Sequence, residues 1–325
     1  MFKKIVSLIL CICLVAVMAL SLTACKGDKS NEYPVTIGDV TIQDEPLNIV
    51  VLSDCFADIV SYIGYDVKMV GRSVEIDQEF LSVVPLVGTA SAPNTEAIIS
   101  SETDLVITEQ ALPENVTATL TDAGVQVLTL KKPTSFEELS SLYVNLGTVL
   151  GGNVTGKEKG KNAYDELTGT MSDFKNAIPS NVVKTACYLY FNENYELCTL
   201  TSGSIEHEFF SYCGAINVFD DQETELVDLE LLKISTPTYI FYDDEAVLTY
   251  LSNDSELANM SALSNGNTMQ VKKTQFSRMG TTYEELIYKM IEFMFIEEAT
   301  ADEATPDSID ETVQLTSENT TVIAE

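Results

Sequence analysis

Short apolar runs alternate with stretches of helical periodicity along most of the chain. In the first half, four such runs are predicted to be buried strands: residues 47–52, 67–70, 105–108 and 125–130. After residue 184 the alternation resumes, with strands predicted at 185–191, 195–200, 238–242 and 268–271. The clearest helical segments near these strands are 57–63 and 205–212. Strands that alternate with helices indicate an α/β architecture with a largely parallel sheet.

Between the two halves, the apolar positions follow the period of an α-helix. Five side chains share one helical face because they are three or four residues apart: Tyr164, Leu167, Met171, Phe174 and Ile178. Asn153 or Thr155 is a candidate cap for the start of this helix, and Pro179 lies just past its end. We therefore expect one long helix over residues 153–180.

Two sequence matches relate the halves to each other. Residues 61–64 (Ser-Tyr-Ile-Gly) recur as 211–214 (Ser-Tyr-Cys-Gly), and residues 96–107 align with 230–241 without a gap. Each match alone is weak, but together they predict two similar lobes, at 35–152 and 181–296, joined by the long helix. The alternative is an ordinary surface helix within one large domain, and the repeats argue against it.

The N-terminus carries the pattern of an export signal. Lys3 and Lys4 precede an apolar run at 5–20, and Leu22-Thr23-Ala24-Cys25 follows. This last motif resembles the bacterial lipobox, which implies that the signal peptide 1–24 is removed and that Cys25 is lipidated. Residues 25–34 are then a tether. A transmembrane anchor is the alternative, but the run is marginally short for one.

Acidic residues dominate the charge of the chain. Fifty Asp and Glu against 18 Lys and Arg give a formal net charge of −32. Such a field repels nucleic acids and anionic lipid headgroups, so neither is expected as a partner. Residues 297–325 contain no basic residue and few large apolar ones, which predicts a disordered acidic tail.

Cysteine and histidine are placed unfavourably for a metal site. No CxxC pair occurs, and the chain has a single histidine, His207, which is interpreted as an ordinary helix residue. We therefore expect no bound bare metal ion. Cys187 and Cys198 flank a predicted hairpin, where they are either joined by a cross-strand disulfide or free and buried.

Several motifs in a fixed order resemble the vitamin B12 and ferric-siderophore binding proteins of bacterial ABC importers. The resemblance covers residues 37–293 and rests mainly on Pro46–Leu52, Val70–Ser73, Pro93–Glu96, Asp104–Ile107, Gly214–Val218, Val227–Glu230 and Ser264–Gly266. It implies two α/β lobes joined by one long helix, with the ligand in the cleft between them and little motion of one lobe against the other.

The resemblance also implies a function and partners. The chain is expected to be a monomeric, lipid-anchored receptor on the extracellular face of the membrane. It would capture a ferric-siderophore-type iron complex and deliver it to a permease dimer with its ATPase subunits; cobalamin or another corrinoid and haem are alternatives. Glu96 and Glu230 match the family's glutamates that pair with permease arginines. Alternatively, each only favours a helix N-terminus. No cofactor is expected, because the metal chelate is cargo.

Ligand contacts are expected in loops that follow the strands, because open α/β sheets bind ligands at the carboxyl ends of their strands. The candidates are Ser53, Arg72, Ser73, Thr89, Asn94 and Glu109 in the first lobe and Tyr190, Tyr195, Ser202, Tyr242 and Arg278 in the second. The chain has only two arginines, Arg72 and Arg278, and each could equally be a surface residue. The acidic field favours neutral or cationic chelates unless these two arginines compensate locally.

Two other classes of function are considered. An extracellular hydrolase is disfavoured because the sequence contains no GxSxG, HExxH or phosphate-loop motif. A sensor that never couples to a transporter is compatible with the same fold. The sequence therefore predicts a binding protein and not an enzyme.

Overall fold

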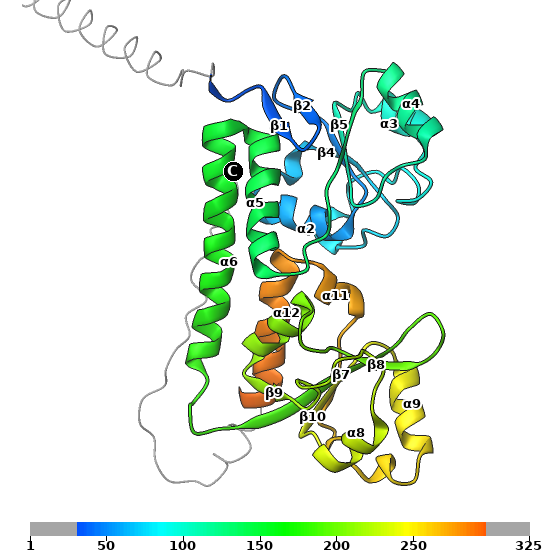
Figure 1. Ribbon diagram of the computed structural model, residues 1–325, viewed down its shortest axis with the longest axis vertical. Coiled ribbons are helices and arrows are strands. Elements are labelled where there is room, and N and C mark those ends of the chain that lie inside the picture. The colour runs from blue at the N-terminus through cyan, green and yellow to red at the C-terminus, as the bar shows by residue number, and fades with distance from the viewer. Residues whose placement is uncertain (1–30, 297–325) are drawn as a thin grey trace, which may run out of the picture.

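The computed structural model describes residues 31–296, which form two α/β lobes stacked along one long axis (Figure 1). Helix α6 (Lys157–Ala177) runs beside both lobes. The predicted signal peptide, Cys25, the start of the tether and the acidic tail 297–325 lie outside the described residues.

The N-terminal lobe contains a parallel sheet with the strand order β4-β3-β5-β6. Its strands are β3 (Ile49–Val51), β4 (Met69–Arg72), β5 (Leu105–Thr108) and β6 (Gln126–Thr129). The helices α2 (Asp54–Tyr62), α3 (Thr95–Ser100) and α4 (Glu114–Asp122) connect them. A hairpin of β1 (Val35–Ile37) and β2 (Val40–Ile42) precedes the sheet; it was not predicted from the apolar pattern.

The C-terminal lobe repeats this strand order as β9-β7-β10-β11. Its parallel strands are β7 (Lys184–Phe191), β9 (Ala215–Asn217), β10 (Tyr239–Tyr242) and β11 (Thr268–Gln270). The extra strand β8 (Leu197–Thr199) runs antiparallel to the end of β7. The helices are α7 (Ile205–Phe210), α8 (Leu229–Ser235), α9 (Glu245–Asn253), α10 (Ser261–Ser264), α11 (Lys273–Ser277) and α12 (Thr281–Ile291).

The two lobes also share their turns. At three equivalent places where a helix gives way to a strand, both lobes use a residue in the left-handed region: Gly64 and Gly214, Glu102 and Thr236, Gly124 and Gly266. The first two pairs fall within the two sequence matches, and the third was not noticed in the sequence. Strand order and turn geometry together confirm the prediction of two similar α/β lobes.

The link between the lobes is more elaborate than one helix. Helix α5 (Phe136–Gly151) packs antiparallel against α6 through a short π-helical turn at Gly152–Gly156, and the Tyr164 hydroxyl of α6 donates to the Phe136 carbonyl 28 residues earlier (3.0 Å). A Cβ atom at Gly160 would overlap the Tyr143 carbonyl, so glycine permits this close approach. Helix α6 begins at Lys157, and neither Asn153 nor Thr155 caps it.

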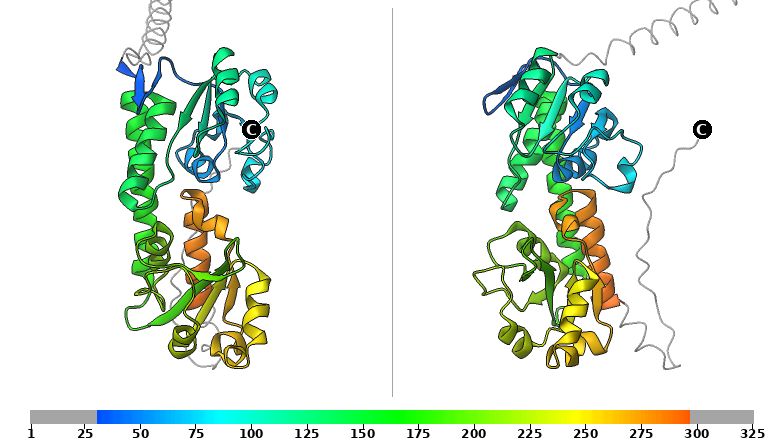
Figure 2. Two further views of the ribbon diagram at one scale, coloured as in Figure 1. Left: turned by 45° about the vertical axis from the view of Figure 1, so that its right-hand side comes forward. Right: turned by 90° about the vertical axis from the view of Figure 1, so that its right-hand side faces the viewer.

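One hydrophobic core runs through both lobes. In β3, Ile49 and Val51 face this shared core while Val50 faces a separate cluster on the outer side of the N-terminal sheet. In β7, Tyr188 faces the shared core and Leu189 an outer cluster of the C-terminal lobe. Helices α5, α6 and α12 also contribute to the shared core, and Figure 2 shows α12 beside α6. This continuous packing joins the two lobes.

Cys187 and Cys198 were candidates for a cross-strand disulfide. Cys187 and Cys198 are both buried and free, so the cross-strand disulfide is not formed. In the observed register Cys198 pairs with Tyr190, three residues from Cys187. Because side chains alternate along a strand, Cys187 and Cys198 point to opposite faces of the sheet.

Candidate ligand-binding site between the lobes

The strand ends of the N-terminal lobe lead into residues that contact the C-terminal lobe. Asp54 follows β3, Asp77 lies in the loop after β4, and Lys132 follows β6. The Lys132 ammonium donates to Glu206 Oε1 (3.1 Å) and Ser277 Oγ (3.2 Å) of the other lobe. We call this region the interlobe junction.

Arg278 is at the centre of the interlobe junction. It is only 8% exposed, and its Nε donates to Asp54 Oδ2 at 2.8 Å while its Nη2 contacts Asp77 Oδ1. Burial raises the pKa of Asp54, an effect that Arg278 opposes. The structure thus places Arg278 between the lobes, but both bonds go to carboxylates of the protein.

A second carboxylate of α2 holds the start of α12. Asp58 is fully buried, and its carboxylate accepts hydrogen bonds from Gly280 N (2.8 Å), Thr282 N (3.2 Å) and Thr282 Oγ1 (2.9 Å). Helix α12 has no side-chain cap from its own N-cap residue, so Asp58 of the opposite lobe caps it instead. Burial raises the pKa of Asp58 to about 6.

Arg72 forms hydrogen bonds inside its own lobe. Its Nε donates to the carbonyls of Leu81 (2.9 Å) and Val84 (3.1 Å), and its Nη1 contacts the carbonyl of Ile76. These bonds hold the loop that follows β4. Arg72 therefore has a clear structural role in addition to its predicted contact with a ligand.

The other candidates of the N-terminal lobe form their hydrogen bonds within that lobe. Ser53 caps α2 and donates to Glu109 Oε2 at 2.7 Å, so the ends of β3 and β5 come together there. Ser73 is buried, with its hydroxyl 3.4 Å from the Leu52 carbonyl. Asn94 caps α3, and Thr89 accepts from the Ala92 amide in the preceding turn (3.0 Å).

The candidates of the C-terminal lobe are less concentrated. The Tyr190 hydroxyl donates to Glu225 Oε2 (2.8 Å), and the Lys273 ammonium lies 3.7 Å from the centre of the Tyr190 ring. Tyr195 is exposed at the tip of the β7–β8 hairpin, Ser202 is exposed, and the Tyr242 hydroxyl donates to Glu245. The structure does not bring Tyr195, Ser202 and Tyr242 into contact with one another.

Several residues of the interlobe junction were missed by the sequence analysis. Lys132 follows β6 and Lys273 follows β11, so the same strand-end rule could have found them. Asp58, Asp77 and Glu225 carry no comparable signal, because their contacts lie far away in the sequence.

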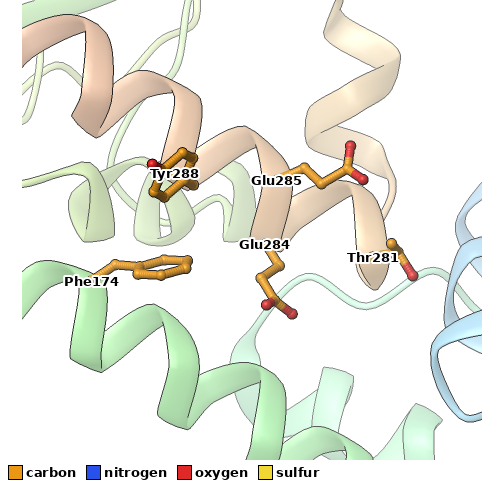
Figure 3. A pocket seen from close by; sticks show the side chains of 5 residues that line it. All are labelled: Phe174, Thr281, Glu284, Glu285 and Tyr288. Atoms are coloured by element: carbon orange, nitrogen blue, oxygen red, sulfur yellow. The ribbon is translucent and has the colours of Figure 1, made fainter. Parts of the chain in front are cut away.

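Two surface pockets lie outside this set of candidates. One has a volume of about 320 Å³ between α6 and α12, where Phe174 and Tyr288 lie on one side and Glu284, Glu285 and Thr281 on the other (Figure 3). The other has a volume of about 450 Å³ and is lined by the loop after β6 and by α5. Neither pocket is lined by a predicted ligand-binding residue.

His207 and the acidic side chains do not assemble a metal centre in the part of the chain that the structure describes. The His207 Nε2 atom lies 2.9 Å from Asp220 Oδ1, which gives this side chain a local partner. Between residues 31 and 296, no helix combines the length and the apolar composition needed to cross a bilayer.

The two predicted docking glutamates have equivalent positions. Glu96 is the second residue of α3 and Glu230 the second of α8, and Asn94 and Asp228 cap these two helices. Both glutamates are exposed, and α3 and α8 lie at opposite ends of the molecule (Figure 1). Glu230 also pairs with Lys233 at 3.1 Å.

Two similar parallel α/β lobes, a long helix beside them and an interlobe junction built from strand ends define a two-lobed solute-binding protein. A family model described as "Periplasmic binding protein" matches residues 49–274. The chain belongs to this family, the substrate-binding proteins of ABC importers, and is a binding protein rather than an enzyme.

Known relatives agree with this assignment. The chain is 23% identical over 262 residues to the Fe(3+)-citrate-binding protein YfmC of Bacillus subtilis, covering 74% of this chain and 78% of the relative. It is 25% identical over 226 residues to the uncharacterized ABC transporter substrate-binding lipoprotein YvrC of the same organism, covering 66% and 71%.

Solved structures share the fold. A periplasmic haem-binding protein from Pseudomonas aeruginosa matches with a TM-score of 0.62 and 19% identity, covering 77% of this chain and 93% of that chain. The vitamin B12 binding protein BtuF of Vibrio cholerae matches with a TM-score of 0.53 and 20% identity, covering 78% and 98%.

Proposed function

We propose that the protein binds a neutral or positively charged iron complex of the ferric-siderophore type between its lobes and delivers it to an ABC permease. The observation that carries this proposal is the use of both arginines. Arg278 is bonded to Asp54 and Asp77, and Arg72 to backbone carbonyls. The charge of Arg278 is thus offset by two carboxylates, and Arg72 is oriented toward the carbonyls of its own loop, which weakens the case for an anionic ligand.

The remaining charges of the interlobe junction support the same conclusion. Lys132 is paired with Glu206, and Lys273 lies over the Tyr190 ring. Carboxylates outnumber basic groups around them: Asp54, Asp77, Glu109, Glu206 and Glu225 against Lys132, Lys273 and Arg278. An anionic complex would be repelled at short range, where screening by salt is weak.

The names of the relatives favour an iron complex as the class of ligand. YfmC is described as an Fe(3+)-citrate-binding protein, and solved relatives bind haem or vitamin B12. Citrate complexes and haem carry carboxylates, which the acidic interlobe junction disfavours. Cobalamin satisfies the charge argument and is therefore the second candidate.

We further propose that Cys25 carries a lipid that holds the protein on the extracellular face of the membrane. The relative YvrC is described as a lipoprotein, which supports this assignment. Glu96 and Glu230 would then meet the permease dimer, whose ATPase subunits drive transport. Their equivalent, exposed positions on two rigid lobes suit such a role.

A panel of ligands tests the proposal on the mature chain with Cys25→Ala. The panel contains a neutral ferric trihydroxamate, a ferric triscatecholate, ferric dicitrate, haem and cyanocobalamin. The readouts are the melting temperature and the fluorescence of the 14 tyrosines, since the chain has no tryptophan. A ligand at one hundred times its Kd stabilises the native state by about 2.7 kcal/mol.

We expect saturable stabilisation by the hydroxamate and little or none by the anionic complexes. Binding of ferric dicitrate or haem alone would overturn the charge argument and leave the receptor function intact. Binding of cyanocobalamin alone would select the second candidate. If nothing in the panel binds, the assignment to iron complexes is wrong.

A further inference from the structure

The loop between β4 and α3 exposes an unusual number of apolar side chains. We call residues 74–86 of this loop the strap; it includes a short 3-10 turn at Glu79–Leu81. Val74, Phe80 and Leu86 are each about half exposed, and Val83 is 87% exposed. Apolar side chains gathered on a surface often mark a binding region.

The strap is held in place rather than loosely attached. Arg72 binds three of its carbonyls, those of Ile76, Leu81 and Val84. The side chains of the same three residues are buried beneath it. The Val74 amide also donates to the Gly88 carbonyl at 2.9 Å. The exposed side chains are therefore presented by a fixed backbone, which lowers the entropic cost of binding through them.

The strap also reaches the interlobe junction. Asp77 contacts Arg278 of the opposite lobe. The side-chain Nε2 of Gln78 lies 3.4 Å from the backbone carbonyl oxygen of Asp54. Gln78 is 4% exposed, so this part of the strap is packed against the junction. The strap thus borders the proposed ligand site through Asp77 and Gln78.

We propose that the strap forms an apolar wall of the ligand site and that Phe80 and Val83 contact the hydrocarbon periphery of the bound chelate. Arg72 is a positioning residue for this wall. The inference rests on the proposed function and adds to it: the preferred chelates are those with apolar groups around the metal. The strap also carries three exposed acidic residues, Glu75, Asp77 and Glu79, and no basic residue, which disfavours a negatively charged ligand.

A series of neutral ferric trihydroxamates with acyl chains of increasing length tests this inference. The measurement is the Kd of each complex for the mature chain with Cys25→Ala and for the same chain with Phe80→Ser and Val83→Ser. Burial of one methylene strengthens binding about fourfold, so Kd should fall by up to this factor per methylene in the parent chain. In the double variant, the dependence on chain length should be lost.

Matched controls separate contact with the ligand from general loss of surface hydrophobicity. Val67 and Ile234 are 86% and 78% exposed and lie outside the strap. Val67→Ser with Ile234→Ser should leave the dependence on chain length unchanged. Arg72→Ala should weaken the dependence of Kd on acyl-chain length and should speed amide exchange in residues 74–86. Arg72→Lys should partly reverse both changes.

The outcomes distinguish the inference from the proposed function. An unchanged dependence on chain length in the Phe80→Ser, Val83→Ser variant would overturn the inference. So would a variant that binds every chelate normally but fails in uptake, because the strap would then be a contact for the permease. If the parent chain binds none of the complexes, the proposed function itself fails.

Discussion

The two lobes share their sheets and differ in the loops at the ends of their strands. Both have the same order of four parallel strands and the same three left-handed turns. The N-terminal lobe carries the strap after β4, whereas the C-terminal lobe carries the antiparallel strand β8 and an exposed hairpin. The repeated parts build the core and present Glu96 and Glu230. Of the parts that do not repeat, the strap reaches the interlobe junction through Asp77 and Gln78, so we infer that it helps to determine the ligand.

Removing the cap that crosses between the lobes should have the largest effect on stability. Asp58→Ala leaves three donors near Gly280 and Thr282 without their acceptor, and we expect a loss of about 2–4 kcal/mol in the free energy of unfolding. Asp228→Ala removes a cap within one lobe and should cost about 1 kcal/mol. Urea denaturation measures both. Equal losses would mean that the contact between lobes is no stronger than an ordinary cap.

The two equivalent glutamates should matter for transport and not for binding. Glu96→Ala with Glu230→Ala should reduce uptake by about a hundredfold, because two contacts with the permease would each lose about 1–2 kcal/mol. The Kd for the ligand in solution should not change. The matched control is Glu114→Ala with Glu158→Ala, two exposed glutamates in the first turns of α4 and α6. Normal uptake in the first variant would remove both residues from the docking surface.

The buried carboxylate of Asp58 should make stability depend on pH. Its pKa is raised from 3.8 to about 6, so between these values the native state binds more protons than the unfolded chain. The associated stabilisation is complete below about pH 4 and is lost as the pH rises through 6, by roughly 1–3 kcal/mol. The measurement is the free energy of unfolding as a function of pH. Subtracting the values for Asp58→Asn from those for the parent chain removes the contribution of the other acids. A difference curve that is flat from pH 4 to 7 would contradict this assignment.

The smallest effect is expected at the equivalent left-handed turns. Glu102 and Thr236 have φ angles of 52° and 40°, a region that side chains other than glycine adopt at a cost. Glu102→Gly and Thr236→Gly should each stabilise the protein by about 0.5–1 kcal/mol, measured as the melting temperature. Stabilisation in one lobe and destabilisation in the other would show that the two turns are not energetically equivalent.

Much of the fold could be predicted because local patterns encode it. The buried strand β5 was predicted with its observed bounds, and Leu167 and Met171 lie in the core as their helical spacing indicated. The hairpin of α5 with α6 was not foreseen, because it depends on close approach at glycines rather than on apolar periodicity. Strands β1 and β2 were not foreseen either; they form a separate hairpin that precedes the alternating strands and helices.

The candidate site was predictable only in outline. The rule that ligands bind at strand ends placed Arg278 in the region between the lobes. The rule could not show that Arg278 is bonded to Asp54 and Asp77, because those contacts join residues about 200 positions apart. For the same reason, nothing in the sequence indicates that Asp58 caps α12 from the other lobe.

Hydrogen exchange with and without a bound chelate tests most directly the claim that the ligand lies between the lobes at the strand ends. Binding should slow exchange in the strap 74–86, in the loop at 108–110 after β5 and in the segment 272–278 that includes α11. Exchange in α3 and α8 should not change. Protection confined to α3 and α8, or to the groove at Phe174 and Tyr288, would contradict the account and place the ligand elsewhere.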